Sequence, residues 1–252
     1  MSLMALSWSN RRKLLYTAVV SVIALIVVYF LYTSLFNRPP TCFDGVQNQD
    51  EHGVDCSGVC SLICKNETRA PIVLWNRAFQ VAPGVYTAAA YVQNPNIGAA
   101  ARRVSYTFQL FDDKNVLVKE RIGMIDIPPV QTVPFIDPNI NVGNRIVAKA
   151  IFAFTQDPVW QRADPLPTLR VGNQSLAADG SRLSATVSNT SIQDASQIVA
   201  TAVLFDAQGV ARAASKSLIP LIARKSSQDV VFTWSGGVPN IIRAEITVLP
   251  SF

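Results

Sequence analysis

The stretch from Leu14 to Phe36 constrains this chain more than any other feature, because it holds 23 consecutive residues without a charged side chain. About 20 apolar residues in a helix, each rising ~1.5 Å, cross the ~30 Å hydrocarbon core of a bilayer. A small soluble domain needs no helix of this length and composition. We therefore expect residues 14–36 to form a transmembrane helix, which places the rest of the chain on one side of a membrane.

Basic residues on the two flanks of this stretch predict its direction. Arg11, Arg12 and Lys13 directly precede it, whereas Arg38 alone follows closely. Because basic residues favour the cytoplasmic side, we expect residues 1–13 to be a cytoplasmic arm and the C-terminal domains to lie outside the cell membrane. A cleaved signal peptide is the competing interpretation, but its apolar region is shorter, ~7–15 residues. We favour an uncleaved, single-pass signal anchor.

All four cysteines follow the helix within one short segment, after the prolines at 39 and 40, which together with Arg38 are expected to end the helix. An even number of clustered cysteines on the outer side of a membrane predicts two disulfides, and three pairings are open. We expect residues 37–69 to be a cysteine-rich stalk. The predicted disulfide cysteines are Cys42, Cys56, Cys60 and Cys64.

The same segment offers candidate metal ligands. Five side chains with oxygen atoms lie within twelve residues, as a calcium loop requires, although their spacing is not that of an EF-hand. The alternative is that these residues form tight turns in a cross-linked loop. Zinc binding by His52 with three of the cysteines is a third interpretation, which an oxidising compartment and the x3 cysteine spacing disfavour. The calcium candidates are Asp44, Asn48, Asp50, Glu51 and Asp55.

The segment from Cys42 to Cys64 reads C-x-D-G-x-x-N-x-D-E-x-G-x-D-C-x-G-x-C-x-x-x-C. This pattern resembles a cysteine motif in surface proteins of several bacterial groups, where it stands beside β-sandwich modules. Ser57 departs from the glycine that the motif commonly has, and the last spacing is one residue longer. The resemblance implies an exported protein of the bacterial cell envelope.

Short runs typical of β-strands begin near residue 70. Turns rich in Asn, Pro, Gly or Asp separate them. The runs are residues 85–93, 103–111, 116–122 and 145–154. The strand near Val104 alternates apolar and polar residues, which predicts one buried face formed by Val104, Tyr106, Phe108 and Leu110.

A second block repeats the first. Asn94, the Leu-Phe-Asp run ending at Asp112 and the Ile-Pro pair at Ile127 recur at offsets of 95, 94 and 92 residues. Two copies of a unit of about 90 residues, each with about seven strands, are typical of tandem immunoglobulin-like β-sandwiches. We predict a mainly β protein with sandwiches at residues 70–157 and 168–252, and a proline-rich linker at 158–167. Trp160 in this linker either packs at the domain junction or caps a core.

The order V-x-N-P-N, L-F-D and I-P-P also resembles two β-sandwich families, the water-stress (late-embryogenesis-abundant) type and the FxLYD type. The second block departs from it at Asn189-Thr-Ser and Ile219-Pro-Leu. The resemblance implies extracytoplasmic or desiccation-associated scaffolding modules without catalysis. We expect Asn94 and Asn189 to be structural, because asparagine side chains bond to backbone in turns.

Charge and motifs exclude several functions. The net charge of +5 is spread without a basic cluster, which argues against nucleic-acid binding. His52 is the only histidine in the sequence, and no G-x-S-x-G, P-loop or H-E-x-x-H motif occurs. We therefore expect no catalytic residues, no cofactor-binding residues and no enzymatic activity.

Three functions remain. The first is a membrane-anchored envelope protein that presents its sandwiches to a protein partner. The second is a structural subunit of a membrane-associated secretion, pilus or transport complex, in which the helix packs laterally through its stripe of small residues. The third is a calcium-responsive or redox-responsive surface module. The helix stripe consists of Thr17, Ser21, Ala24 and Val28.

Overall fold

The computed structural model describes residues 8–36, 40–130 and 132–251. The chain forms two compact units, residues 1–59 and residues 60–252, each described by itself below. Within these residues, the first unit holds one helix and an irregular loop with cysteines, and the second holds thirteen strands and a short 3₁₀ helix, η1 (Lys65–Glu67).

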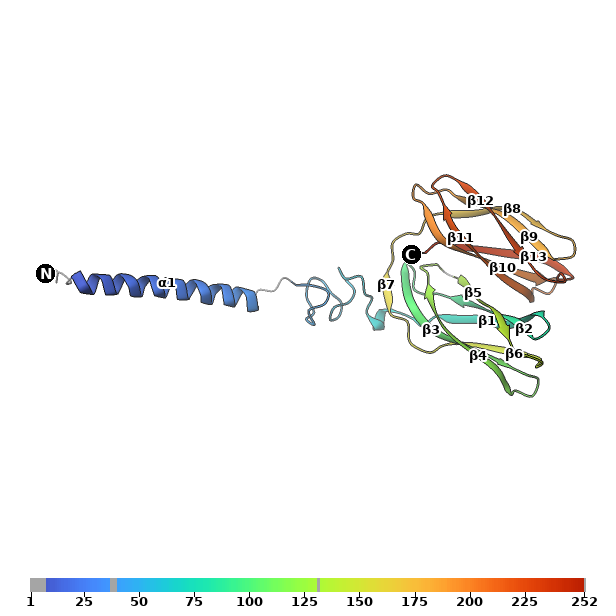
Figure 1. The fold of residues 1–252 in the computed structure, drawn as a ribbon, viewed down its shortest axis with the longest axis horizontal. Coiled ribbons are helices and arrows are strands. Elements are labelled where there is room, and N and C mark those ends of the chain that lie inside the picture. Colours follow the sequence, from blue (N-terminus) through green and yellow to red (C-terminus); the bar gives the residue numbers. More distant parts are fainter. Residues whose placement is uncertain (1–7, 37–39, 131, 252) are drawn as a thin grey trace. The chain divides into compact units, whose positions relative to one another are not determined.

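Helix α1 (Trp8–Phe36) begins six residues before the predicted transmembrane segment. The added turn contains the basic flank, and the Arg12 guanidinium lies 3.8 Å above the ring of Trp8, a cation–π contact between residues four apart. Residues Asn10–Ser34 are long and apolar enough to cross a membrane (Figure 1). The predicted helix stop at Arg38 and Pro39 lies outside the described residues.

The mainly β architecture is confirmed, with two sandwich-like domains of two sheets each. The first sandwich packs sheet β1-β2-β5 on sheet β4-β3-β6, and the second packs sheet β12-β9-β8 on sheet β11-β10-β13. The strands of the first are β1 (Ile72–Ala82), β2 (Val85–Gln93), β3 (Ala99–Phe111), β4 (Leu117–Ile127), β5 (Thr132–Asn141) and β6 (Lys149–Phe154). Those of the second are β8 (Leu169–Leu176), β9 (Arg182–Asn189), β10 (Ala195–Asp206), β11 (Ala211–Ile222), β12 (Ser227–Thr233) and β13 (Ile241–Leu249).

After β6 the chain passes into β7 (Trp160–Arg162), which pairs with the start of β3 and makes that sheet four-stranded. Within the described residues, the first sandwich therefore has the expected seven strands and the second has six. Trp160 is 3% exposed and packs in the core of the first sandwich. The predicted linker thus begins with a strand that belongs to the first domain.

The end of the cysteine-rich segment also joins the first sandwich. Leu62 forms a β-bridge with Gln161, and the amide of Ile63 donates to the carbonyl of Trp160 at 2.9 Å. The Ile63 side chain packs against the same core. Residues 61–63 are therefore part of the second compact unit and continue the edge formed by β7.

Two buried asparagines occupy equivalent places in the two sandwiches. Nδ2 of Asn94 donates to the carbonyls of Ala99 and Pro128 at 2.9 and 3.0 Å. Nδ2 of Asn189 donates to the carbonyls of Gln193 and Ile222 at 2.8 and 3.1 Å. Asn94 thus joins the loop between β2 and β3 to the end of β4, and Asn189 joins the loop between β9 and β10 to the end of β11. The predicted structural role of both asparagines is confirmed.

The turn between β1 and β2 requires a glycine. Gly84 has φ of +71°, and a Cβ atom there would lie 2.2 Å from the carbonyl oxygen of Gly143. Gly98, at φ of +72°, has open space around its Cβ position. At both positions a residue with a side chain would be strained by the positive φ. Only at Gly84 would its Cβ atom also clash with another part of the chain.

We expect Gly84→Ala to lower the free energy of unfolding by about 3 kcal/mol, and Gly98→Ala by about 1 kcal/mol. Chemical denaturation measures the loss of unfolding free energy in each variant. Because the backbone strain is the same in both, the difference between the two losses gives the cost of the clash. Equal losses in the two variants would show that the approach to Gly143 is not tight in solution.

Candidate functional site

The disulfide prediction is confirmed, because all four cysteines are disulfide-bonded. Cys60 and Cys64 are buried, at 1% and 5% exposure. The segment has few apolar residues for a core, and cross-links supply the order that burial does not. Disulfides form and persist mainly in oxidising compartments, in keeping with extracytoplasmic domains.

The acidic residues of the loop bind its own backbone. Asp55 accepts hydrogen bonds from the amides of Asp44 and Gly45 at 3.0 and 2.9 Å. Asp44 accepts from the amides of Thr41 and Val46, each at 2.9 Å. The hydrogen bond from Thr41 and those from Asn48 and Val46 lower the pKa of Asp44. These carboxylates therefore organise turns in a loop without regular secondary structure.

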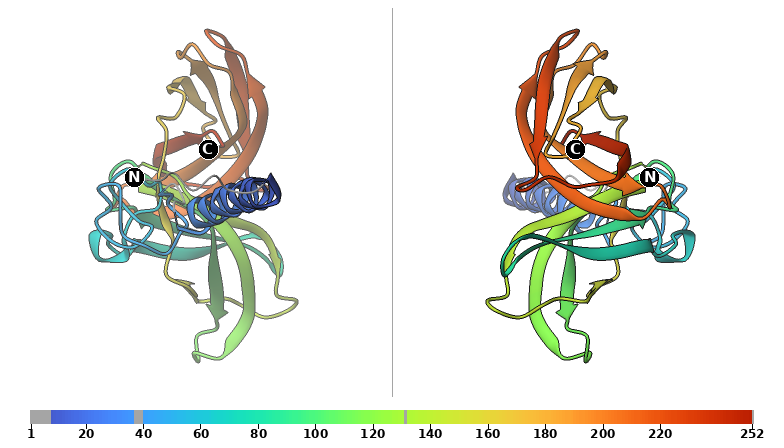
Figure 2. Two further views of the ribbon diagram at one scale, coloured as in Figure 1. Left: turned by 90° about the vertical axis from the view of Figure 1, so that its left-hand side faces the viewer. Right: turned by 90° about the vertical axis from the view of Figure 1, so that its right-hand side faces the viewer.

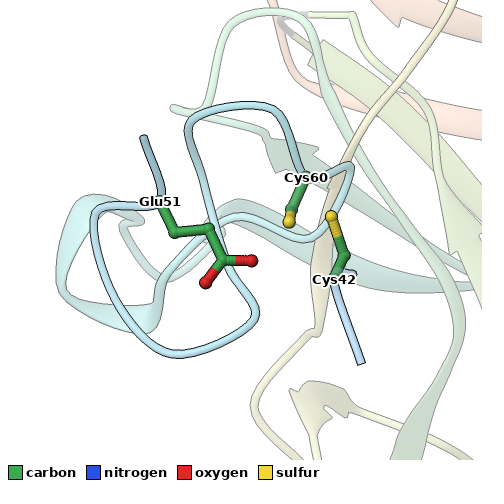
Figure 3. A group of neighbouring side chains, drawn as sticks. All are labelled: Cys42, Glu51 and Cys60. Carbon is green, nitrogen blue, oxygen red and sulfur yellow. The ribbon is translucent and has the colours of Figure 1, made fainter. Parts of the chain in front are cut away.

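Glu51 is 6% exposed, and its Oε2 accepts from the amides of Asn48 and Asp55 at 3.2 and 3.1 Å. Within the described residues, the metal-ligating side chains that come together are Cys42, Glu51 and Cys60 (Figure 3). Both sulfur atoms are in disulfides and offer no thiolate, so this grouping does not fit a metal ion. It also omits four of the five calcium candidates, and calcium binding stays a prediction.

Ser57 takes a left-handed backbone conformation, with φ of 58°. Glycine adopts this conformation without the steric cost that a Cβ atom brings. The geometry thus accounts for the glycine that the resembling cysteine motif commonly has here.

The second compact unit brings its two sandwiches together face to face. Sheet β1-β2-β5 of the first packs against sheet β11-β10-β13 of the second, so that four sheets form successive layers (Figures 1 and 2). The core between the two inner sheets is separate from the cores of the sandwiches. It consists of Phe79, Ala89, Ile136, Val203, Phe205, Ala211 and Ala214.

Polar contacts border this junction core. The Tyr91 hydroxyl donates to Oε2 of Glu245 at 2.8 Å, and its ring stacks on Trp75 with centroids 4.7 Å apart. Burial, with the hydrogen bond to Glu245, raises the pKa of Tyr91. Lys216 Nζ donates to the carbonyl of Ile136 at 3.0 Å. Both hydrogen bonds join one sandwich to the other.

One side of the junction is hollow. A cavity of about 300 Å³ lies between β3, β4 and β5 of the first sandwich and β10, β11 and β13 of the second. Phe108, Val133 and Phe135 contribute apolar walls from the first sandwich, and Val199 and Leu249 from the second. Tyr106 also lines it, and burial beside Asp137 raises the pKa of Tyr106 to about 12. The phenol is therefore neutral near pH 7.

Alternation of apolar and polar residues along the strands does not predict the junction. In β2 the residues from Tyr86 to Ala90 are all buried, and in β10 so are those from Ala200 to Asp206. A strand covered on both faces is apolar or small at every position and does not alternate. The runs Ala88–Ala90 and Val203–Phe205 show this pattern of small or apolar residues without alternation.

The Leu-Phe-Asp repeats place two equivalent carboxylates in turns. Asp206 Oδ1 accepts from the amides of Val210 and Gln208 at 2.9 and 3.0 Å, and Oδ2 accepts from Arg212 Nε at 2.6 Å. Burial acts to raise the pKa of Asp206, but these hydrogen bonds outweigh it and the pKa is lowered. Asp112 makes the same contacts with Val116, Lys114 and Arg145.

A lowered pKa predicts a dependence of stability on acid. Asp206 stabilises the fold above its unfolded pKa of about 3.9, and this stabilisation is lost as the pH falls through the lower folded pKa. We expect Asp206→Asn to lower the melting temperature at pH 6, with the difference from wild type shrinking towards pH 2. Melting curves across this range provide the measurement. A difference that grows on acidification would contradict the assignment.

Comparisons with known proteins do not identify a family. No protein-family model matches the chain, and no curated protein matches it significantly. Its structure is similar to the crystal structure of red sea bream transglutaminase, with 10% sequence identity and a TM-score of 0.25. The match covers 73% of this chain and 30% of the transglutaminase chain. At this TM-score the likeness supports no inference about activity.

Proposed function

We propose that the chain is a non-enzymatic, single-pass membrane protein that holds a docked pair of β-sandwiches outside the cell membrane for contact with a protein of the envelope. The observation that carries the proposal is the succession of two features. A helix long and apolar enough to span a bilayer is followed by a segment whose cysteines are all oxidised. The basic residues before the helix and the oxidised cysteines after it independently favour the same outward direction for the C-terminal domains.

The sandwich pair suits a binding role better than a spacer role. Its two sheets share an apolar core and two hydrogen bonds across the junction, so the pair presents one surface of fixed shape. Ile122 and Met124 are 74% and 60% exposed on β4, an edge strand that pairs with β3. Exposed apolar residues on a sheet edge offer a protein partner both side-chain and backbone contacts.

Intact mass analysis of the chain extracted from membranes without reductant tests the anchor. We expect a mass that retains the N-terminal helix and lacks four hydrogen atoms, one for each oxidised thiol. The protein should stay with the membrane at alkaline pH, which removes peripheral proteins. A mature chain that begins after residue 36, or free thiols at the four cysteines, would overturn the proposal.

The subunit alternative predicts a different result from the same membranes. Crosslinking followed by purification would then recover a stoichiometric complex that depends on the helix stripe. Under the envelope-binding proposal, crosslinks form instead through the sandwiches, and substitutions at Ile122 and Met124 reduce them.

A further inference from the structure

The cavity at the sandwich junction opens to solvent at one end. A volume of 300 Å³ reaches the lower limit of small-molecule sites, which occur preferentially between domains. At roughly 30 Å³ for each heavy atom, the share of a water molecule in the liquid, about ten heavy atoms would fit.

Strand β10 runs from the closed part of the junction into the cavity. On the junction face of β10, Val203 and Phe205 pack in the closed core against the first sandwich, whereas Val199 and Thr201 line the cavity. Val199 is 40% exposed, so this end is open to solvent. The cavity therefore has an apolar interior and an accessible mouth.

Lys216 supplies the cation at this site. Its Nζ makes one hydrogen bond, to the Ile136 carbonyl at 3.0 Å, and an ammonium group has three donors. Within the described part of the chain, no carboxylate forms an ion pair with it. Asp126 also lines the cavity, and its Oδ1 is already bound by the amide of Arg103 at 2.6 Å.

We propose that this cavity binds a medium-chain carboxylate, with its alkyl chain against Phe108, Phe135 and Leu249 and its carboxylate on Lys216. The apolar walls stabilise the chain by removing it from water, and the ammonium provides a charge-assisted hydrogen bond to the head. This ligand goes beyond the proposed envelope-binding function, which does not require it.

The test uses the full chain in phosphatidylcholine nanodiscs and an octanoic acid that carries a photoreactive diazirine on its alkyl chain. Peptide mapping after illumination should find the label within residues 133–136 and 197–201. Sodium octanoate should compete for this labelling, while octyltrimethylammonium at the same concentration should compete about tenfold less, because its head repels Lys216. Equal competition by the two would overturn the assignment of Lys216.

Two substitutions define the site further. Val199→Trp fills the mouth and should reduce the cavity labelling about tenfold, whereas Val231→Trp, at a valine that is 38% exposed on β12, should leave it unchanged. Lys216→Met should reduce labelling about tenfold and Lys119→Met should not. Labelling that survives Val199→Trp, or that is confined to residues 14–36, would overturn the proposal. If a variant does not fold, the competition experiment on the unmodified chain still tests whether the cavity binds the carboxylate through Lys216.

Discussion

Replacing Ala89 by aspartate is expected to separate the two sandwiches while each remains folded. Ala89 is fully buried in the junction core, whereas its neighbours Ala88 and Ala90 face the core of the first sandwich. An aspartate there would place an unpaired charge against Val203 and Phe205, at a cost of about 4 kcal/mol. The separate cores should keep the individual domains intact.

Calorimetry of the full chain should then show two melting transitions in the Ala89→Asp variant in place of one coupled transition. Ala153→Asp, at an exposed alanine on β6, is the matched control and should melt like wild type. A variant that loses all β-structure would show that the first sandwich does not fold without its partner. Unchanged melting of Ala89→Asp would show that the sheets are not docked in solution.

The second large effect is expected at Asn94, which is 3% exposed. Leucine at this position would leave the carbonyls of Ala99 and Pro128 without donors, and the amide of Asn96 without its acceptor at 2.9 Å. Each unsatisfied buried group costs about 1–3 kcal/mol, so we expect a loss of about 4 kcal/mol in unfolding free energy.

Denaturant titration measures this loss, and Asn144→Leu is the control. Asn144 is exposed, and its replacement should change stability by less than about 0.5 kcal/mol. Asn189→Leu should repeat the effect in the second sandwich, because its contacts are equivalent. If Asn94→Leu costs no more than Asn144→Leu, the buried asparagine does not hold its two loops together.

Local features of this chain were predictable from the sequence because short-range chemistry determines them. The uncharged run predicted the helix, the clustered cysteines predicted disulfides, and the Asn and Asp repeats predicted the turns. Helix α1 begins at Trp8, before the uncharged run, because apolarity identifies the membrane-spanning part of a helix and not its polar first turns. The β7 pairing was missed because a strand of three residues has too few positions for a pattern.

The docking of the sandwiches depends on contacts between residues far apart in the chain. Tyr91 and Glu245 are 154 positions apart, and Lys216 and Ile136 are 80 apart. Alternation within a strand identifies a buried face but not what covers the other face. The small residues at Ala88–Ala90 fit either a tightly packed single core or two cores, and the long-range fold decides between them.

Labelling of lysines directly tests whether the helix anchors the chain with its sandwiches outside the cell. Lys13 is the one lysine before the apolar stretch, and exposed Lys114, Lys119 and Lys225 belong to the sandwiches. An amine reagent that does not cross membranes should label these three in intact cells and should reach Lys13 only after permeabilisation. Labelling of Lys13 in intact cells, with the sandwich lysines protected until permeabilisation, would contradict this orientation of the helix.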